Sequence, residues 1–206
     1  MSAPGSPLEQ YQSKRDFERT SEPGAEDQAL DWADERPIFV IQKHDASSLH
    51  YDFRIEVDGT LKSWAVPKGP STDPRERRLA LPTEDHPLAY SDFEGVIPAD
   101  EYGGGTVLIW DRGSYRNLKE EEGQEPSSVA EQVEDGHVTI WLKGRKVSGG
   151  YALIRTGGDD GRWLLIKMDD DEADARRNPT STEPKSVKTG RTLEEIRREE
   201  ASKEDE

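Results

Sequence analysis

Short apolar runs of strand length follow one another from Pro37 onward, separated by glycine, proline and acidic turns. Two of these runs flank Asp58-Gly59, and Asp-Gly is a favoured two-residue turn of a β-hairpin. Many short strands joined by such turns are typical of an antiparallel barrel or sandwich. The sequence therefore predicts a mainly β fold, with strands over residues 39–41, 48–57, 60–66, 78–81, 106–110, 137–142, 147–156 and 162–168.

The two flanks of this region have few apolar anchors and many charges. Residues 1–36 are predicted to form an extended N-terminal arm with one short helix around residues 8–17. Residues 169–206 are predicted to form an acidic, largely disordered tail, in which Thr192 and Glu195 have the spacing of a helix capping box. The β domain then spans residues 37–168, with a polar loop and a little helix over 117–135.

The composition bears on packing and on cellular compartment. Hydrophobic residues make up 31% of the 206 residues and charged residues 35%, so part of the chain is expected to remain unpacked. The absence of cysteine excludes disulfides and thiolate metal sites and fits a reducing cytoplasm. The first residues lack a secretory signal, and no apolar stretch approaches the length of a membrane span. We therefore expect a soluble cytoplasmic protein with no membrane partner.

The net charge of −16 argues at first against a nucleic-acid partner. Its distribution weakens that objection, because residues 37–168 carry 16 basic against 22 acidic side chains and most of the excess lies in the flanks. Acidic flanks are usually solvated tails, and a cytoplasm of high salt is the alternative explanation. In either case, phosphate binding must come from a local cluster of basic residues.

The segment from His44 to Arg54 contains the most informative group of polar residues. Because side chains alternate between the faces of a strand, His50, Asp52 and Arg54 share one face, and the aromatic residues between them point to the core. Two imidazoles and a carboxylate are a familiar ligand set for a divalent transition metal such as Mn²⁺ or Zn²⁺. His44 would come from the preceding turn. The alternative is a solvent-facing strand without an ion.

The expected hairpin places small residues beside this polar row. Regular pairing across the turn sets Arg54 opposite Ser63 and Asp52 opposite Ala65, which leaves room for an ion or a phosphate. Arg54 is expected to hold a metal-bound phosphate in a fork.

Two later groups add basic and titratable side chains. Arg75-Glu76-Arg77-Arg78 precedes a strand-like run, and His86 precedes Pro87, which favours an extended backbone at the histidine. That conformation suits a positioned acid or a phosphate ligand. Ordinary turn and loop packing remains the alternative for these residues and for Tyr90.

Several segments together resemble the 3′-phosphoesterase domain of DNA ligase D, over roughly residues 9–170. They are His44-Asp45-Ala46-Ser47-Ser48-Leu49-His50-Tyr51-Asp52-Phe53-Arg54, Asp85-His86-Pro87-Leu88, Tyr90-Ser91-Asp92-Phe93-Glu94-Gly95-Val96-Ile97-Pro98, Glu101-Tyr102-Gly103, Thr106–Asp111, Gly149–Lys167 and Lys14-Arg15-Asp16-Phe17 with Thr20 and Glu22-Pro23. The segment from Ser186 to Ile196 resembles the one that joins this module to the ligase module. The given sequence stops soon after this segment, where the fused enzymes continue, so we expect a free-standing version of the domain.

The resemblance implies a compact antiparallel β-barrel with a few short helices and flexible acidic termini. It also implies an Mn²⁺-dependent hydrolase, with Zn²⁺ or Co²⁺ as other candidate ions. Such enzymes remove 3′ phosphates and 3′-terminal ribonucleotides from a DNA primer–template and leave a 3′ hydroxyl. Carried over to this sequence, the metal ligands are His44, His50 and Asp52, the catalytic and phosphate-contacting residues are Arg54, Lys68, Arg78, His86 and Tyr90, and the arm contributes Arg15, Asp16 and Glu22.

Two departures accompany this resemblance. Ala46-Ser47 stands where the family commonly has Ala-Thr, and the acidic flanks bear on salt optimum and DNA affinity. The hairpin pairing also leaves Lys68 unplaced, because it lies beyond Pro67, where the strand should have ended.

No serine stands in a convincing nucleophile setting, so we expect direct attack by water, with His86 donating a proton to the leaving 3′ oxygen. Two other classes compete with this function: a non-catalytic module that docks DNA ends or a ligase, and a phosphoesterase for small phosphorylated metabolites. The resemblance further implies a monomer near the nucleoid, with an ATP-dependent ligase, a primase-like polymerase and Ku as partners.

Overall fold

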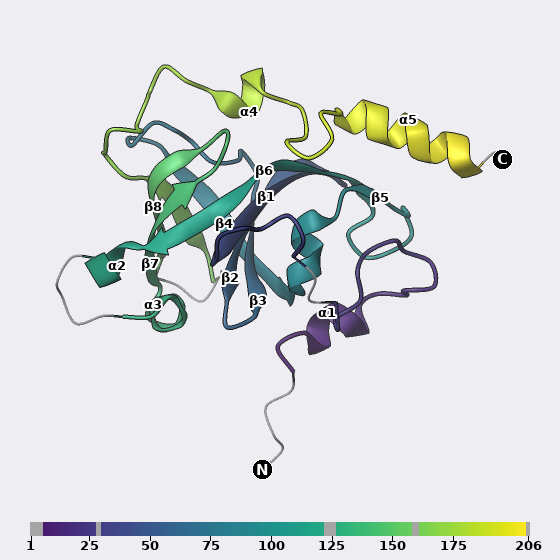
Figure 1. The fold of residues 1–206 in the computed structure, drawn as a ribbon, viewed down its shortest axis with the longest axis horizontal. Coiled ribbons are helices and arrows are strands. Elements are labelled where there is room, and N and C mark those ends of the chain that lie inside the picture. The colour runs from purple at the N-terminus through teal and green to yellow at the C-terminus, as the bar shows by residue number, and fades with distance from the viewer. Residues whose placement is uncertain (1–5, 28–29, 122–126, 158–160, 205–206) are drawn as a thin grey trace, which may run out of the picture.

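One antiparallel sheet organises the chain in the computed structural model, which describes residues 6–27, 30–121, 127–157 and 161–204 (Figure 1). Along the sheet the strands follow the order β1-β2-β3-β4-β9-β8-β7-β6-β5. Their bounds are β1 Ile38–Asp45, β2 Leu49–Val57, β3 Thr60–Val66, β4 Arg77–His86, β5 Gly95–Ile97, β6 Gly105–Asn117, β7 His137–Lys143, β8 Ser148–Arg155 and β9 Trp163–Lys167.

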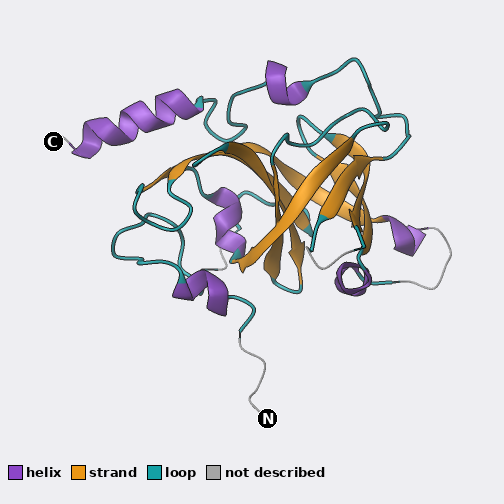
Figure 2. Ribbon diagram, turned by 180° about the vertical axis from the view of Figure 1, so that it is seen from behind, coloured by secondary structure: helices purple, strands orange, loops and turns teal. Residues whose placement is uncertain are grey.

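The sheet closes on itself because β6 pairs with β1 as well as with β7 and β5. Eight strands thus form a barrel, and β5 extends from the edge of β6 (Figure 2). The short helices are α1 Glu9–Ser13, the 3₁₀ helix η1 Leu88–Asp92, α2 Leu118–Glu121, α3 Val129–Asp135, α4 Pro179–Thr182 and α5 Leu193–Glu204. The expectation of a mainly β fold closed as an antiparallel barrel is confirmed.

The β2–β3 hairpin has the register that its turn residues predict. Asp58 and Gly59 both have positive φ, 49° and 79°, as a type I′ turn requires. Arg54 consequently pairs with Ser63, and Asp52 pairs with Ala65. A one-residue slip would move every side chain of β2 to the opposite face, so this turn helps to fix which residues face outward.

Alternation along the strands separates two apolar clusters. Phe39 and Ile41 belong to the cluster that fills the barrel, together with side chains from the other barrel strands. Val40, between them on β1, faces outward and belongs to a second cluster, which also contains Tyr11 of the arm and Leu88 of η1. The outer face of this part of the barrel is therefore covered by the arm and by η1.

The N-terminal arm is folded against the barrel. Its expected short helix is present as α1, and Tyr11 on that helix is fully buried and donates its hydroxyl to the Pro23 carbonyl at 2.6 Å. Residues 1–5 and 28–29 of the expected arm lie outside the described residues.

The segment after β9 also differs from the expectation drawn from composition. In place of a largely disordered tail, residues 169–204 run along the barrel, and α5 extends beyond it (Figure 1, yellow). Trp110 donates its indole N–H to the Glu183 carbonyl at 2.8 Å, and Ile196 of α5 is fully buried. The expected capping box is present, because Glu195 N donates to the Thr192 hydroxyl and Thr192 N donates to the Glu195 carboxylate.

The strand boundaries differ from the sequence prediction mainly in length. β4 continues through Pro82 to His86, and β5 was not predicted at all. The expected polar segment 117–135 contains α2 and α3, and residues 122–126 lie outside the described residues. Within the described part of the chain, no helix has the length and apolar character needed to cross a bilayer.

Ile196→Ala should destabilise the protein if α5 is part of the packed structure. The substitution removes a fully buried side chain, so we expect the free energy of unfolding to fall by about 2 kcal/mol. Arg198→Ala, at an exposed position of the same helix, is the matched control and should change it by less than about 0.5 kcal/mol. Urea denaturation measures both, and equal values for the two variants would show that α5 is not packed against the barrel.

Candidate metal centre

Two adjacent strands bring two histidines and an aspartate together on the outer face of the barrel. His44 lies within β1, not in the preceding turn as expected, and it pairs directly with His50 of β2. Asp52 follows two residues later on the same face. One potential ligand atom from each of the three side chains lies within 4.8 Å of the others, so the group is able to hold a metal ion.

The hydrogen bonds of the two imidazoles fix which nitrogen is free. His44 Nε2 lies 2.8 Å from the Gly103 carbonyl, and His50 Nδ1 lies 2.9 Å from the Ser48 carbonyl. A carbonyl oxygen only accepts, so each of these nitrogens carries the proton. The lone pairs of His44 Nδ1 and His50 Nε2 then face Asp52, as in metal sites whose histidines donate their other N–H to a backbone group.

The distances to the carboxylate agree with this interpretation. His44 Nδ1 lies 3.4 Å from one Asp52 oxygen and His50 Nε2 lies 3.6 Å from the other, which is long for good hydrogen bonds. Burial alone would raise the pKa of Asp52, but the charge of the neighbouring Arg54 outweighs it and helps to hold that pKa well below the usual range. In their neutral forms, the two imidazoles together with the carboxylate make a donor set that fits a divalent transition metal.

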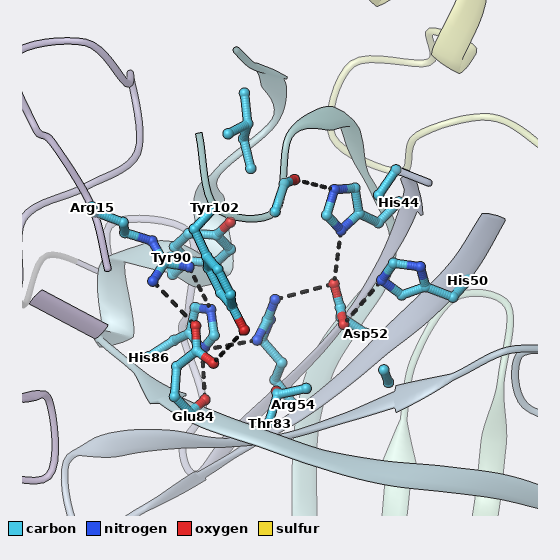
Figure 3. A pocket seen from close by; sticks show the side chains of 14 residues that line it. Arg15, His44, His50, Asp52, Arg54, Thr83, Glu84, His86, Tyr90 and Tyr102 are labelled. Carbon is cyan, nitrogen blue, oxygen red and sulfur yellow. Dashed lines mark hydrogen bonds and ion pairs between the residues drawn. The ribbon is translucent and has the colours of Figure 1, made fainter. Parts of the chain in front are cut away.

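Arg54 connects the metal-ligand set to the rest of the site (Figure 3). Its guanidinium is buried and lies 3.2 Å from Asp52 on one side and 3.0 Å from His86 Nδ1 on the other. It also donates to Gln42 at 2.8 Å and to Ser63 at 2.9 Å. Ser63, the small residue opposite Arg54 in the hairpin, thus anchors the guanidinium.

His86 is buried between two guanidinium groups. Its Nδ1 also lies 2.8 Å from the Glu84 carbonyl, and its Nε2 lies 3.4 Å from Arg15. Burial, and after it the charges of Arg54 and Arg15, lowers the pKa of His86 well below its usual range. A ring that is neutral at physiological pH suits a phosphate contact better than the proton donation expected from the sequence.

The N-terminal arm contributes a buried ion pair, Arg15 with Glu22, to the side of the site that contains His86. Arg15 donates to Glu22 at 2.9 Å, and the same carboxylate oxygen accepts from the Tyr90 hydroxyl at 2.9 Å. Burial raises the pKa of Tyr90 well above its ordinary value, so the phenol keeps its proton. Asp16, the third expected arm residue, is exposed and accepts from the backbone N–H of Glu18 within its own turn.

Glu84 and Tyr102 line the site but were not among the expected residues. Glu84 is buried and accepts from Arg15 at 3.1 Å, and it also contacts Lys14 and Tyr102. Its position two residues before His86 in an extended strand would have placed both on one face. Tyr102 lies in a loop, where strand alternation makes no prediction, and only its place in the family-like segment Glu101-Tyr102-Gly103 pointed to it.

These side chains surround a cleft of about 270 Å³. The lining residues are Arg15, His44, Ala46, His50, Asp52, Arg54, Ala65, Thr83, Glu84, His86, Tyr90, Ile97, Tyr102 and Gly103.

Four of the expected residues do not line this cleft: Asp16, Glu22, Lys68 and Arg78. Glu22 lies behind it, where it holds Arg15 and Tyr90. Arg78 lines a separate cavity and donates to Glu76 at 2.6 Å. On β4 it shares the face of Ala80, two residues further on, which points to the barrel interior and not to the outer face that carries the cleft. Lys68 is exposed, two residues past the end of β3.

The charges around the cleft are balanced among the described residues. Lys14, Arg15 and Arg54 supply three cations, and Glu22, Asp52 and Glu84 supply three carboxylates that contact them. A divalent ion on the histidine–aspartate set would make this cluster net positive. Anion binding would then depend on the ion, in a protein whose overall charge is strongly negative.

The fold and the site together define a β-barrel protein with a candidate metal centre beside a buried arginine on its outer face. Comparison with known proteins identifies the family. The family model of the DNA ligase D 3′-phosphoesterase domain matches residues 42–155. The chain therefore belongs to this family, as the resemblance in its sequence predicted.

Curated relatives agree with this assignment. The chain is 47% identical over 191 residues to the multifunctional non-homologous end joining protein LigD of Pseudomonas aeruginosa, covering 91% of this chain and 22% of that protein. It is 44% identical over 161 residues to the multifunctional non-homologous end joining DNA repair protein LigD of Mycobacterium tuberculosis, covering 78% of this chain and 20% of that protein. The chain thus spans about a fifth of the length of these relatives.

Glu84→Gln should reduce stability in a pH-dependent way. Burial raises the pKa of Glu84, but hydrogen bonding to its own backbone N–H and the charge of Arg15 outweigh this and lower it below 4.5. The stabilisation is therefore complete above about pH 4.5 and is lost as the pH falls through the folded-state pKa. We expect the variant to lose about 1–3 kcal/mol at pH 7, and the difference to shrink in acid.

Urea denaturation between about pH 7 and about pH 3 measures this difference. Asp85→Asn, which removes a more exposed ion pair with Lys62, is the matched control and should cost less than about 1 kcal/mol. A loss in Glu84→Gln that stays constant across the pH range would contradict the assignment.

Proposed function

We propose that this protein is a metal-dependent phosphoesterase that heals the 3′ ends of DNA. It removes a 3′ phosphate, and a 3′-terminal ribonucleotide, to leave a 3′ hydroxyl for repair. Membership of the DNA ligase D 3′-phosphoesterase domain family supports this class of hydrolase. The observation that carries the proposal is the grouping of His44, His50 and Asp52 on one face of the barrel, directly beside Arg54.

Separate groups of residues would hold the metal ion and bind the phosphate. His44, His50 and Asp52 would hold Mn²⁺, with Zn²⁺ and Co²⁺ as other candidate ions. A bound divalent ion supplies Lewis-acid polarisation of a phosphoryl oxygen and lowers the pKa of water. Arg54, fixed by Gln42 and Ser63, would orient the phosphate and stabilise charge on its oxygens.

The remaining side chains position the phosphate and exclude solvent. His86 would contact the phosphate as a neutral ring held between Arg54 and Arg15. Tyr90 and Glu22 would keep Arg15 in place on the arm side. The reaction is then attack of water on phosphorus with cleavage of the bond to the 3′ oxygen, which takes up a proton to give the hydroxyl.

The proposal does not depend on Arg78, Lys68 or Asp16. The guanidinium of Arg78 is paired with Glu76 in another cavity, and Asp16 closes a turn of the arm. Lys68 is exposed at the end of the β2–β3 hairpin where His50 lies, a position from which it would meet DNA outside the cleft.

The relatives are multifunctional proteins of non-homologous end joining. By analogy we propose that this protein acts in the cytoplasm at the nucleoid, as a monomer. Its product would pass to an ATP-dependent DNA ligase and a primase-like polymerase at ends held by Ku.

A labelled DNA primer–template that ends in a 3′ phosphate tests the reaction. We expect conversion to a 3′ hydroxyl that requires a divalent metal and falls at least 100-fold in His50→Ala, because the variant loses a ligand. His137→Ala, an exposed histidine on β7 outside the cleft, is the matched control and should retain full activity.

The assay should cover a range of salt, because the chain is acidic overall. If folded protein converts no substrate with any metal or at any salt concentration, a module that docks DNA ends or a ligase becomes the better explanation. Faster turnover of free nucleotides than of the primer–template would instead favour a phosphoesterase for small metabolites.

A further inference from the structure

Tyr102 is the most exposed large side chain on the wall of the cleft. It lines the cleft, yet 48% of its surface is exposed, so one part of the ring is available at the cleft mouth. Figure 3 shows the ring lying over the cleft, with its hydroxyl directed at Glu84. A single exposed aromatic side chain is ordinary on a protein surface, but this one lies at the mouth of a candidate phosphate site.

The ring is held in place from both ends. Its hydroxyl donates to Glu84 at 3.4 Å and accepts from Lys14 at 3.3 Å, and the Lys14 ammonium lies 4.5 Å from the ring centre. The next residue, Gly103, accepts the N–H of the metal-ligand candidate His44. The loop that carries Tyr102 is thus tied to the metal centre on one side and to the arm on the other.

The backbone at the end of this loop packs closely against the end of β1. Gly105 has a φ of 149°, and a Cβ at this position would lie 2.3 Å from the Asp45 carbonyl oxygen. On the other side of Tyr102, Glu101 forms an ion pair with Arg19 of the arm at 2.7 Å. A ring on such a loop is pre-organised, so binding a ligand against it costs little conformational entropy.

We propose that Tyr102 is a stacking platform for the 3′-terminal base of the DNA. This inference rests on the proposed function, because the phosphate at the cleft floor determines where the attached nucleotide lies. The sugar and base of that nucleotide extend from the floor toward the mouth, where the ring is exposed. Stacking on an aromatic ring tolerates every base, which suits an enzyme that meets DNA ends of any sequence.

Lys14 completes this subsite with a positive charge. Its side chain is 35% exposed and lies beside both Tyr102 and Glu84. It is therefore placed to approach the phosphate that links the terminal nucleotide to the rest of the strand. Because Glu84 neutralises Lys14 in part, the ring is expected to contribute more to binding than the ammonium does.

Kinetics on two primers separate stacking from a general structural effect. One primer ends in an ordinary nucleotide with a 3′ phosphate, and the other ends in an abasic nucleotide with the same phosphate. We expect Tyr102→Ala to raise KM about tenfold on the ordinary primer with little change in kcat, and to have no effect on the abasic primer. Tyr102→Phe, which keeps the ring, should stay within about threefold of the unmodified protein.

A fluorescence measurement tests the same contact without turnover. 2-Aminopurine loses fluorescence when it stacks on an aromatic ring, and it is placed at the 3′ terminus of the primer and, as a control, three nucleotides inward. With Zn²⁺ present and a non-hydrolysable 3′ phosphonate in place of the phosphate, the unmodified protein should quench the terminal probe and leave the internal probe unchanged, whereas Tyr102→Ala should quench neither. Phe17→Ala, which removes an exposed aromatic ring outside the cleft, is the matched control and should quench like the unmodified protein.

The two measurements distinguish the inference from the proposed function. Tyr102-dependent quenching in a protein that shows no turnover would support the stacking platform and overturn the proposed hydrolysis. Turnover without Tyr102-dependent quenching, or an equal KM increase on the abasic primer, would overturn the stacking platform. Absence of both quenching and turnover would overturn both.

Discussion

The antiparallel pairing of β1 with β2 is the interaction on which the candidate site depends. It sets His44 opposite His50 and Gln42 opposite Asp52, so ligands from two strands meet on one face. The opposite face of the same strands fills the barrel with apolar side chains, which rules out a slip of one residue. The stability of the hydrophobic core thereby fixes the geometry of the polar site on its outer surface.

A second constraint is the burial of several charged groups beneath the cleft. Removing charges from water is costly unless each is paired and hydrogen-bonded. Arg54 meets this condition through Gln42, Asp52 and Ser63. Arg15 meets it through Glu22 and Glu84, and therefore needs both the arm and β4. The arm thus does more than cover apolar surface, because it completes the electrostatic balance of the site.

The sequence was informative where a short-range rule determines the structure. The Asp58-Gly59 turn predicted the hairpin and its register, and strand alternation predicted that His50, Asp52 and Arg54 share a face. Family resemblance identified the arm residues Arg15 and Glu22, which lie far from the strands in sequence and which no local pattern connects to the site.

The errors arose where long-range packing decides the outcome. Arg78 belongs to the same strand as His86, but an irregularity in the β3–β4 pairing lies between them, and Arg78 lines a different cavity. The tail was judged from its average composition, although Pro179, Ser186 and Ile196 are buried through contacts that composition does not reveal. Tyr102 was not expected at the cleft because its position depends on a loop held by residues from distant parts of the chain.

The most direct test of the account is a titration of the metal-free protein with Mn²⁺, followed by the electron paramagnetic resonance signal of the free ion. The arrangement of His44, His50 and Asp52 predicts one tight site per chain. Binding at that site should be at least about tenfold weaker in His44→Ala and unchanged in His137→Ala. Equal affinity in all three proteins would show that this group does not bind the ion, and would contradict the account.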